Sequence, residues 1–268
     1  MIRPVLLGPS GIGKTPLSKL FKLESWHPYR VRAPRNEEDA KTCLSPEEYQ
    51  RRERLHAQDT PLYEGARRLR VYRERSLVEV RGTAQCLEHT PSIGDPSRAV
   101  LIELFAPVFV ELLRNRERIS PVVRLDPNDL LVLLLNPTSV SCAEIRDVPE
   151  ALSAVIRCGI LERSRLLGAG VDTADVERRV ASVSEEVVAW REVIELVPGR
   201  VVECRAWRHS EYRYMDPNGA CGAAAVDELT KARVTLLAEV AEQVPNALPE
   251  FKRIVRTPQE IQRLTHIV

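Results

Sequence analysis

The feature that most constrains the fold is a glycine-rich stretch near the N-terminus, Gly8-Pro9-Ser10-Gly11-Ile12-Gly13-Lys14-Thr15. Its spacing fits G-x-x-x-x-G-K-[ST], in which glycines let backbone N–H groups approach phosphate oxygens. An apolar run at 5–7 precedes the stretch, and Leu17, Leu20 and Phe21 follow it at helical spacing. Strand, loop and helix in this order predict a phosphate-binding loop. We expect Lys14 to reach the β- and γ-phosphates of ATP and the Thr15 hydroxyl to ligate Mg²⁺.

Composition narrows the class of protein. The chain has 268 residues, of which 44% are hydrophobic and 29% charged, as in globular domains. Its 39 basic residues nearly balance its 38 acidic residues, so no global field favours nucleic acid or membrane. The longest apolar run, at 130–135, is too short to cross a membrane. Six scattered cysteines form no C-x-x-C pair, and we expect reduced thiols, no all-protein metal site, no signal peptide and a cytoplasmic location.

The predicted elements alternate between strands and helices. Buried strands are expected at 99–104, with Glu103 near the carboxyl end, at 130–135 and at 200–205, and helices at 46–56, 107–113, within 148–195 and at 226–244. Segments 69–72 and 77–80 predict antiparallel strands or a hairpin, and 90–96 a loop. This order indicates an α/β fold with a mainly parallel sheet. Its carboxyl edge would gather the glycine-rich loop, Glu103 and the turn at Asn136.

Several further motifs follow the loop in order. They are Arg32-Ala33-Pro34-Arg35 with Glu38, then Leu44–Tyr49, Leu101–Glu103, Leu131–Ser139, and Gly170–Asp172 leading to Glu177–Val180. Together with the loop they resemble the guanylate-kinase branch of the P-loop nucleoside-phosphate kinases over residues 3–195. The resemblance implies a P-loop NTPase fold, three-layer αβα. It also implies an acceptor-binding insertion at about 28–98 and a helical lid at about 160–185, within a kinase-like domain of 1–245 followed by a tail, 246–268, of unassigned role.

The resemblance also implies roles for individual residues. Gly8 through Thr15 and Arg179 would bind ATP, Thr15 would hold Mg²⁺, and Lys14, Arg178 and Glu103 would act in catalysis. The acceptor would be bound by Arg32, Arg35, Glu38, Lys41 and Glu103. From the residues alone, Arg32 and Arg35 are spaced so that an extended segment could present both guanidinium groups to an anion. Each arginine also has a simpler interpretation as a solvated surface charge.

The acceptor itself is left open by the sequence. Residues 62–98 and 143–160 have no counterpart in the family, and no match is found for the side chains that read guanine. The expected function is an ATP-dependent kinase acting on a nucleotide-like or other phosphorylated or hydroxylated small molecule. The alternatives are a kinase acting on hydroxymethylated DNA bases, with arginines 51, 52, 54, 67, 68 and 70 as a basic groove, and a nucleotide-binding interaction module with little turnover. An ATPase or GTPase switch is less favoured, since no Asp-x-x-Gly segment is convincing. A homodimer is possible.

Overall fold

A five-stranded parallel sheet forms the centre of the molecule. The computed structural model describes residues 1–34, 40, 42–55, 57–145, 150–166, 172–208 and 223–266. The strand order is β11-β10-β1-β9-β2, and every neighbouring pair is parallel. The strands are β1 (Arg3–Leu7), β2 (Ser25–Trp26), β9 (Leu101–Glu103), β10 (Leu130–Leu135) and β11 (Val201–Cys204). The predicted α/β class with a parallel sheet is thus confirmed.

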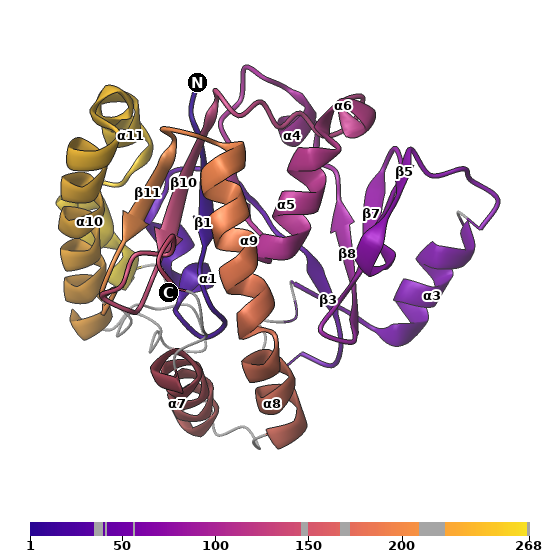
Figure 1. Cartoon of the computed structure of the whole chain (residues 1–268), viewed down its shortest axis with the longest axis horizontal. Coiled ribbons are helices and arrows are strands. Elements are labelled where there is room, and N and C mark those ends of the chain that lie inside the picture. The colour runs from indigo at the N-terminus through magenta and orange to yellow at the C-terminus, as the bar shows by residue number, and fades with distance from the viewer. Residues whose placement is uncertain are drawn as a thin grey trace.

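Helices cover both faces of this sheet, because its strands are apolar on both faces. Leu130, Val132 and Leu134 of β10 face one core with α5 and α9, and the intervening leucines face a second core with α1, α10 and α11. The helices are α1 (Lys14–Leu17), α3 (Pro46–Leu55), α4 (Pro91–Gly94), α5 (Ala106–Arg114), α6 (Arg116–Ile119), α7 (Glu150–Leu166), α8 (Thr173–Ala181), α9 (Val183–Leu196), α10 (Ala223–Gln243), α11 (Leu248–Ile254) and α12 (Pro258–Gln262). Figure 1 shows α7 and α8 beyond the carboxyl end of β1.

A second, mostly antiparallel sheet extends from one side of the first (Figure 1). Its order is β4-β3-β8-β7-β6-β5, from β3 (Tyr29–Val31), β4 (Cys43–Leu44), β5 (Tyr63–Glu64), β6 (Arg70–Val71), β7 (Arg75–Val80) and β8 (Thr83–Glu88). The expected antiparallel pairing of 69–72 with 77–80 is present as β6 with β7. The longer hairpin is β7 with β8, joined through Arg81 and Gly82, and it was not predicted.

Two local predictions need correction. The helix expected after Thr15 is short, since α1 ends at Leu17 and continues only as a 3₁₀ turn, η1 (Ser18–Leu20). The segment 90–96, predicted as a loop, contains the short helix α4. This helix begins at Pro91, because the fixed φ of proline favours the first helical turn. The N-terminus of α3 is as expected, with the Glu48 N–H donating to Ser45 Oγ at 3.1 Å.

The C-terminal residues, to which the sequence assigned no role, pack against the segment that follows the glycine-rich loop. Phe21 pairs with Val255 in a β-bridge, and its ring lies 6.1 Å from that of Phe251. Arg256 donates to the carbonyls of Leu20 and Lys19 at 2.8 and 2.9 Å. The segment 248–264 is therefore part of the second core rather than an appendage.

No helix in the described ranges has both the length and the apolar character needed to span a membrane.

Candidate nucleotide site

The glycine-rich loop connects β1 to α1 at the carboxyl edge of the parallel sheet. Gly8, Gly11 and Gly13 have φ values of 147°, 81° and 93°, which side chains on L-residues rarely allow. A Cβ on Gly8 would also lie 2.9 Å from the Leu135 carbonyl oxygen, so the loop passes too close to β10 for any side chain. Of the two glycines that the sequence pattern requires, Gly8 is fixed by both constraints and Gly13 by its positive φ.

Lys14 folds back over the loop. Its Nζ donates to the carbonyl oxygens of Gly8 at 2.5 Å and Pro9 at 3.0 Å. Burial lowers the pKa of the ammonium from 10.5 to about 8, although the carboxylates of Glu186 and Glu103 oppose this shift. The Lys14 ammonium is therefore a desolvated cation held against the glycine-rich loop. A phosphate bound there would place a negative charge beside it and favour its protonated form.

Thr15 and Glu103 meet beside the lysine. Thr15 Oγ1 donates to Glu103 Oε1 at 2.5 Å, and Glu103, at the end of β9, is only 8% exposed. A hydroxyl and a carboxylate are both oxygen ligands, so the pair fits Mg²⁺, which takes few protein ligands and completes its shell with water and phosphate. Within the described residues, no group of three or more His, Cys, Asp or Glu side chains is arranged to hold a metal ion.

Two neighbouring arginines of α8 have different surroundings. Arg179 NH1 donates to Ser10 Oγ of the loop at 2.9 Å, and its Nε donates to Asp175 at 2.8 Å. Arg178 is 47% exposed and pairs with Asp172 and Asp175 at 3.9 and 3.5 Å. The structure thus brings Arg179 to the predicted phosphate site and leaves Arg178 on the outer face of the helix.

Helix α7 packs against the glycine-rich loop at Gly11. A Cβ built on Gly11 would lie 3.3 Å from Ile160 Cγ1 and 3.6 Å from the Gly159 carbonyl carbon. The segment 143–160, which had no family counterpart, therefore contributes part of the cover of the loop through the α7 residues Gly159 and Ile160.

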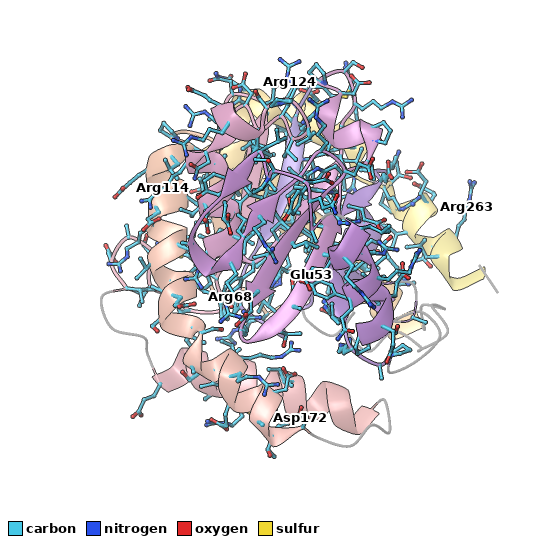
Figure 2. The ribbon with its side chains drawn as sticks, turned by 90° about the vertical axis from the view of Figure 1, so that its right-hand side faces the viewer. Glu53, Arg68, Arg114, Arg124, Asp172 and Arg263 are labelled. Atoms are coloured by element: carbon cyan, nitrogen blue, oxygen red, sulfur yellow. The ribbon has the colours of Figure 1, made fainter. Side chains whose placement is uncertain are left out.

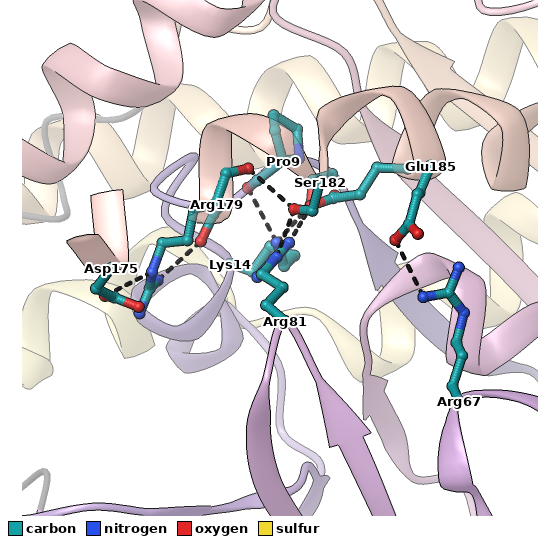
Figure 3. A network of polar contacts seen from close by, with 11 residues as sticks. Pro9, Lys14, Arg67, Arg81, Asp175, Arg179, Ser182 and Glu185 are labelled. Carbon is teal, nitrogen blue, oxygen red and sulfur yellow. Dashed lines mark hydrogen bonds and ion pairs between the residues drawn. The ribbon is translucent and has the colours of Figure 1, made fainter. Parts of the chain in front are cut away.

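Two contributors to the site were missed by the sequence reasoning, Arg81 and Glu186. Arg81 lies at the tip of the β7–β8 hairpin, forms an ion pair with Glu186 of α9, and donates from Nε to Ser182 Oγ at 2.6 Å (Figure 3). Glu186 is 1% exposed, and burial raises its pKa against the opposing influence of Arg81 and Lys14. The Arg-Gly pair between alternating strands was the one available signal, since such a pair favours a tight hairpin turn.

The predicted acceptor residues are only partly described. Arg32, just after β3, donates from NH1 to the Ala33 carbonyl at 2.8 Å. Arg35, Glu38 and Lys41 lie outside the described residues. A cavity between the second sheet and the β9–α5 connection is lined by apolar side chains such as Leu69, Val78 and Phe105, with Ser76 and Gln85 as polar members.

Comparison with known proteins gives no family assignment. A scan against protein-family models finds no match, and a search of curated proteins finds no significant relative.

Proposed function

We propose that this protein is an ATP-dependent phosphotransferase that phosphorylates a nucleotide-like or other small-molecule acceptor with the help of Mg²⁺. The observation that carries the proposal is the glycine-rich loop with Lys14 on its carbonyls and Thr15 on Glu103, at the carboxyl edge of a parallel sheet. Ligands bind at this edge in open α/β folds. The ordered resemblance to guanylate kinases supports the same function and a P-loop fold. The scattered cysteines, with no C-x-x-C pair, support a cytoplasmic setting.

Each residue has a defined task in this proposal. The loop N–H groups and Lys14 hold the β- and γ-phosphates of ATP, and Arg179 adds charge from α8. Thr15 and Glu103 hold Mg²⁺, directly or through water; when bound, the ion neutralises charge on the same phosphates. Arg32 and Arg35 bind the anionic part of the acceptor. Positioning and charge stabilisation, rather than covalent chemistry, are what phosphoryl transfer requires of a protein.

The arginine clusters bear on the choice of acceptor. Arg51 and Arg52 bind Glu48, Arg68 binds Glu79, Arg70 binds Glu53, and Arg67 binds Glu185. Figure 2 shows Glu53 and Arg68 on the same side of the molecule. A surface that binds DNA must offer positive charge to phosphates, and these carboxylates cancel much of it. The pairing favours a small-molecule acceptor over hydroxymethylated DNA.

The test is transfer of label from ATP carrying ³²P in the γ-position. The full chain would be incubated with Mg²⁺ and a panel of nucleoside monophosphates, sugar phosphates and hydroxymethylated DNA, and the products separated. We expect label on one class of small acceptor, and no transfer when Lys14 is replaced by alanine. Release of free phosphate with no labelled acceptor would refute the kinase, and ATP binding without turnover would favour the interaction module.

A further inference from the structure

The turn of the β7–β8 hairpin directs the side chain of Arg81 toward the candidate nucleotide site. Arg81 and Gly82 connect the paired residues Val80 and Thr83, and both have left-handed backbones, with φ of 52° and 72°. Two left-handed residues in a two-residue loop match the twist of the flanking strands, but an arginine at the first position carries a steric cost. The conformation sends the arginine side chain away from the second sheet and toward α9 (Figure 3).

The guanidinium of Arg81 is held from three sides. Its Nε donates to Ser182 Oγ at 2.6 Å, a terminal nitrogen pairs with Glu186, and its carbon lies 4.3 Å from the centre of the Phe105 ring. The Arg81 side chain is only 17% exposed. A guanidinium fixed in this way has already lost its rotamer freedom, so it can meet a ligand without a further ordering cost.

Glu186 joins this arginine to the lysine of the loop. The carboxylate is buried and interacts electrostatically with Arg81, Lys14 and Arg179. A buried carboxylate is costly unless cations surround it, and here the cations come from the hairpin, the glycine-rich loop and α8. Three cations from separate elements thus interact with one internal carboxylate. A bound phosphate would be a second anion for the same three cations.

The pair Arg67–Glu185 serves as an internal comparison. It also joins the second sheet to the first turn of α9, at 3.0 Å, and Arg67 also faces the Phe105 ring, at 5.9 Å. Its side chains are 31% and 48% exposed, and neither is among the charged groups, Glu186, Glu103, Arg81 and Arg30, that shift the pKa of Lys14. If holding the sheet against the helix were the only requirement, an exposed pair of this kind would suffice.

We propose that Arg81 binds the terminal phosphate of the nucleotide beside Lys14, and that Glu186 is the positioning residue that holds Arg81 there before the ligand arrives. This inference rests on the proposed function of the same site. It adds to that function a phosphate contact supplied by the second sheet, which lies within the expected acceptor-binding insertion at about 28–98.

The test compares two double variants of the full chain. Arg81→Ala with Glu186→Gln removes both charges of the proposed contact. A substitution of Arg81 alone would leave the buried carboxylate of Glu186 unpaired. Arg67→Ala with Glu185→Gln is the matched control, because Arg67 also has a left-handed backbone, with φ of 54°. Calorimetry would measure the Kd of each protein for Mg²⁺-adenylyl imidodiphosphate and for ADP, after thermal unfolding has shown that the variants fold.

We expect the Arg81/Glu186 variant to bind adenylyl imidodiphosphate about 10- to 100-fold more weakly than wild type, as loss of a charged hydrogen bond predicts. Its affinity for ADP, which lacks the terminal phosphate, and both affinities of the Arg67/Glu185 control should change less than about threefold. Equal losses in both variants, equal losses for both nucleotides, or unchanged binding would overturn the inference while leaving the proposed function intact. Failure of the wild type to bind either nucleotide would overturn both. If the double variant does not fold, Arg81→Lys, which keeps the charge and removes the planar fork, replaces it and is judged by the same nucleotide difference.

Discussion

The glycine-rich loop and the β7–β8 hairpin supply the same site in different ways. The loop works through its backbone, because its glycines adopt conformations and approaches that exclude side chains, and Lys14 folds onto its carbonyls. The hairpin works through one long side chain, Arg81, whose position depends on a buried carboxylate contributed 105 residues later in the chain. The first arrangement is sensitive to backbone shape, and the second to charge pairing. Variants that change only one of these properties should therefore separate the two regions.

Removal of the loop cation should have the largest effect. With Lys14→Ala, the transferred phosphate loses its charge clamp, and we expect phosphoryl transfer to fall by about 100-fold or more. Lys22→Ala is the control, since Lys22 pairs with Glu260 at 2.8 Å outside the loop. The rates would be measured with labelled ATP at saturating acceptor. If Lys14→Ala transfers phosphate as fast as Lys22→Ala, then Lys14 does not stabilise the transferred phosphate.

The two arginines of α8 offer the next largest contrast. Arg179→Ala removes the hydrogen bond to Ser10 and a cation from the site, so nucleotide affinity should fall about 10- to 100-fold. Arg178→Ala removes only exposed ion pairs, so its effect should stay below about twofold. Calorimetric titration with adenylyl imidodiphosphate would measure both. A larger loss at Arg178 would mean that α8 rotates when the nucleotide binds.

Nucleotide affinity should also depend on pH through Lys14. Its pKa of about 8 lies below the usual 10.5 because of burial, so the free site loses its ammonium charge as the pH rises through 8. Affinity for a triphosphate should fall about tenfold from pH 7 to pH 9. Glu186→Gln should shift this midpoint to lower pH, since the carboxylates of Glu186 and Glu103 raise the pKa while Arg81 and Arg30 lower it.

The same titration affects stability in the opposite direction. In the unfolded chain the lysine keeps its proton up to about pH 10.5, so between pH 8 and 10.5 the unfolded state binds more protons than the folded state. The contribution of Lys14 to the free energy of unfolding therefore rises with pH over this window. Chemical denaturation of wild type and Lys14→Met at several pH values would isolate it. A wild-type affinity that stays flat to pH 9.5 would contradict the lowered pKa.

The smallest contrast concerns backbone shape alone. Gly82→Ala places a methyl group in open space at a φ of 72°, so it should cost only about 1 kcal/mol of left-handed strain. Gly8→Ala meets the same restriction at a φ of 147° and also places its Cβ 2.9 Å from the Leu135 oxygen, so its cost should be greater. Urea denaturation at fixed pH would compare the two. Equal costs would indicate that the loop can move away from β10.

The regions also differ in how far sequence alone could predict them. The loop, β9 with Glu103, and β10 were predictable because each rests on neighbours in the chain: fixed glycine spacing, or an apolar run buried on both faces. Arg81 was not, because the Arg-Gly pair at 81–82 predicts only a tight turn and does not show what the arginine side chain contacts. Its environment is created by Glu186 and Ser182, which only the tertiary fold brings close. The proline at position 16 likewise gave no warning that α1 would end after one turn.

The packing of the C-terminal segment has a consequence for the order of assembly during synthesis. Arg256 hydrogen-bonds the backbone of Lys19, 237 residues earlier, and Phe251 and Val255 cover Phe21. While the ribosome is still adding residues before 251, the turn behind the glycine-rich loop has no such cover and exposes an aromatic ring. Because domains emerge N-terminus first, this first-made segment is among the last to be completed. A chaperone acting on the nascent chain would therefore find an early apolar binding site beside the glycine-rich loop.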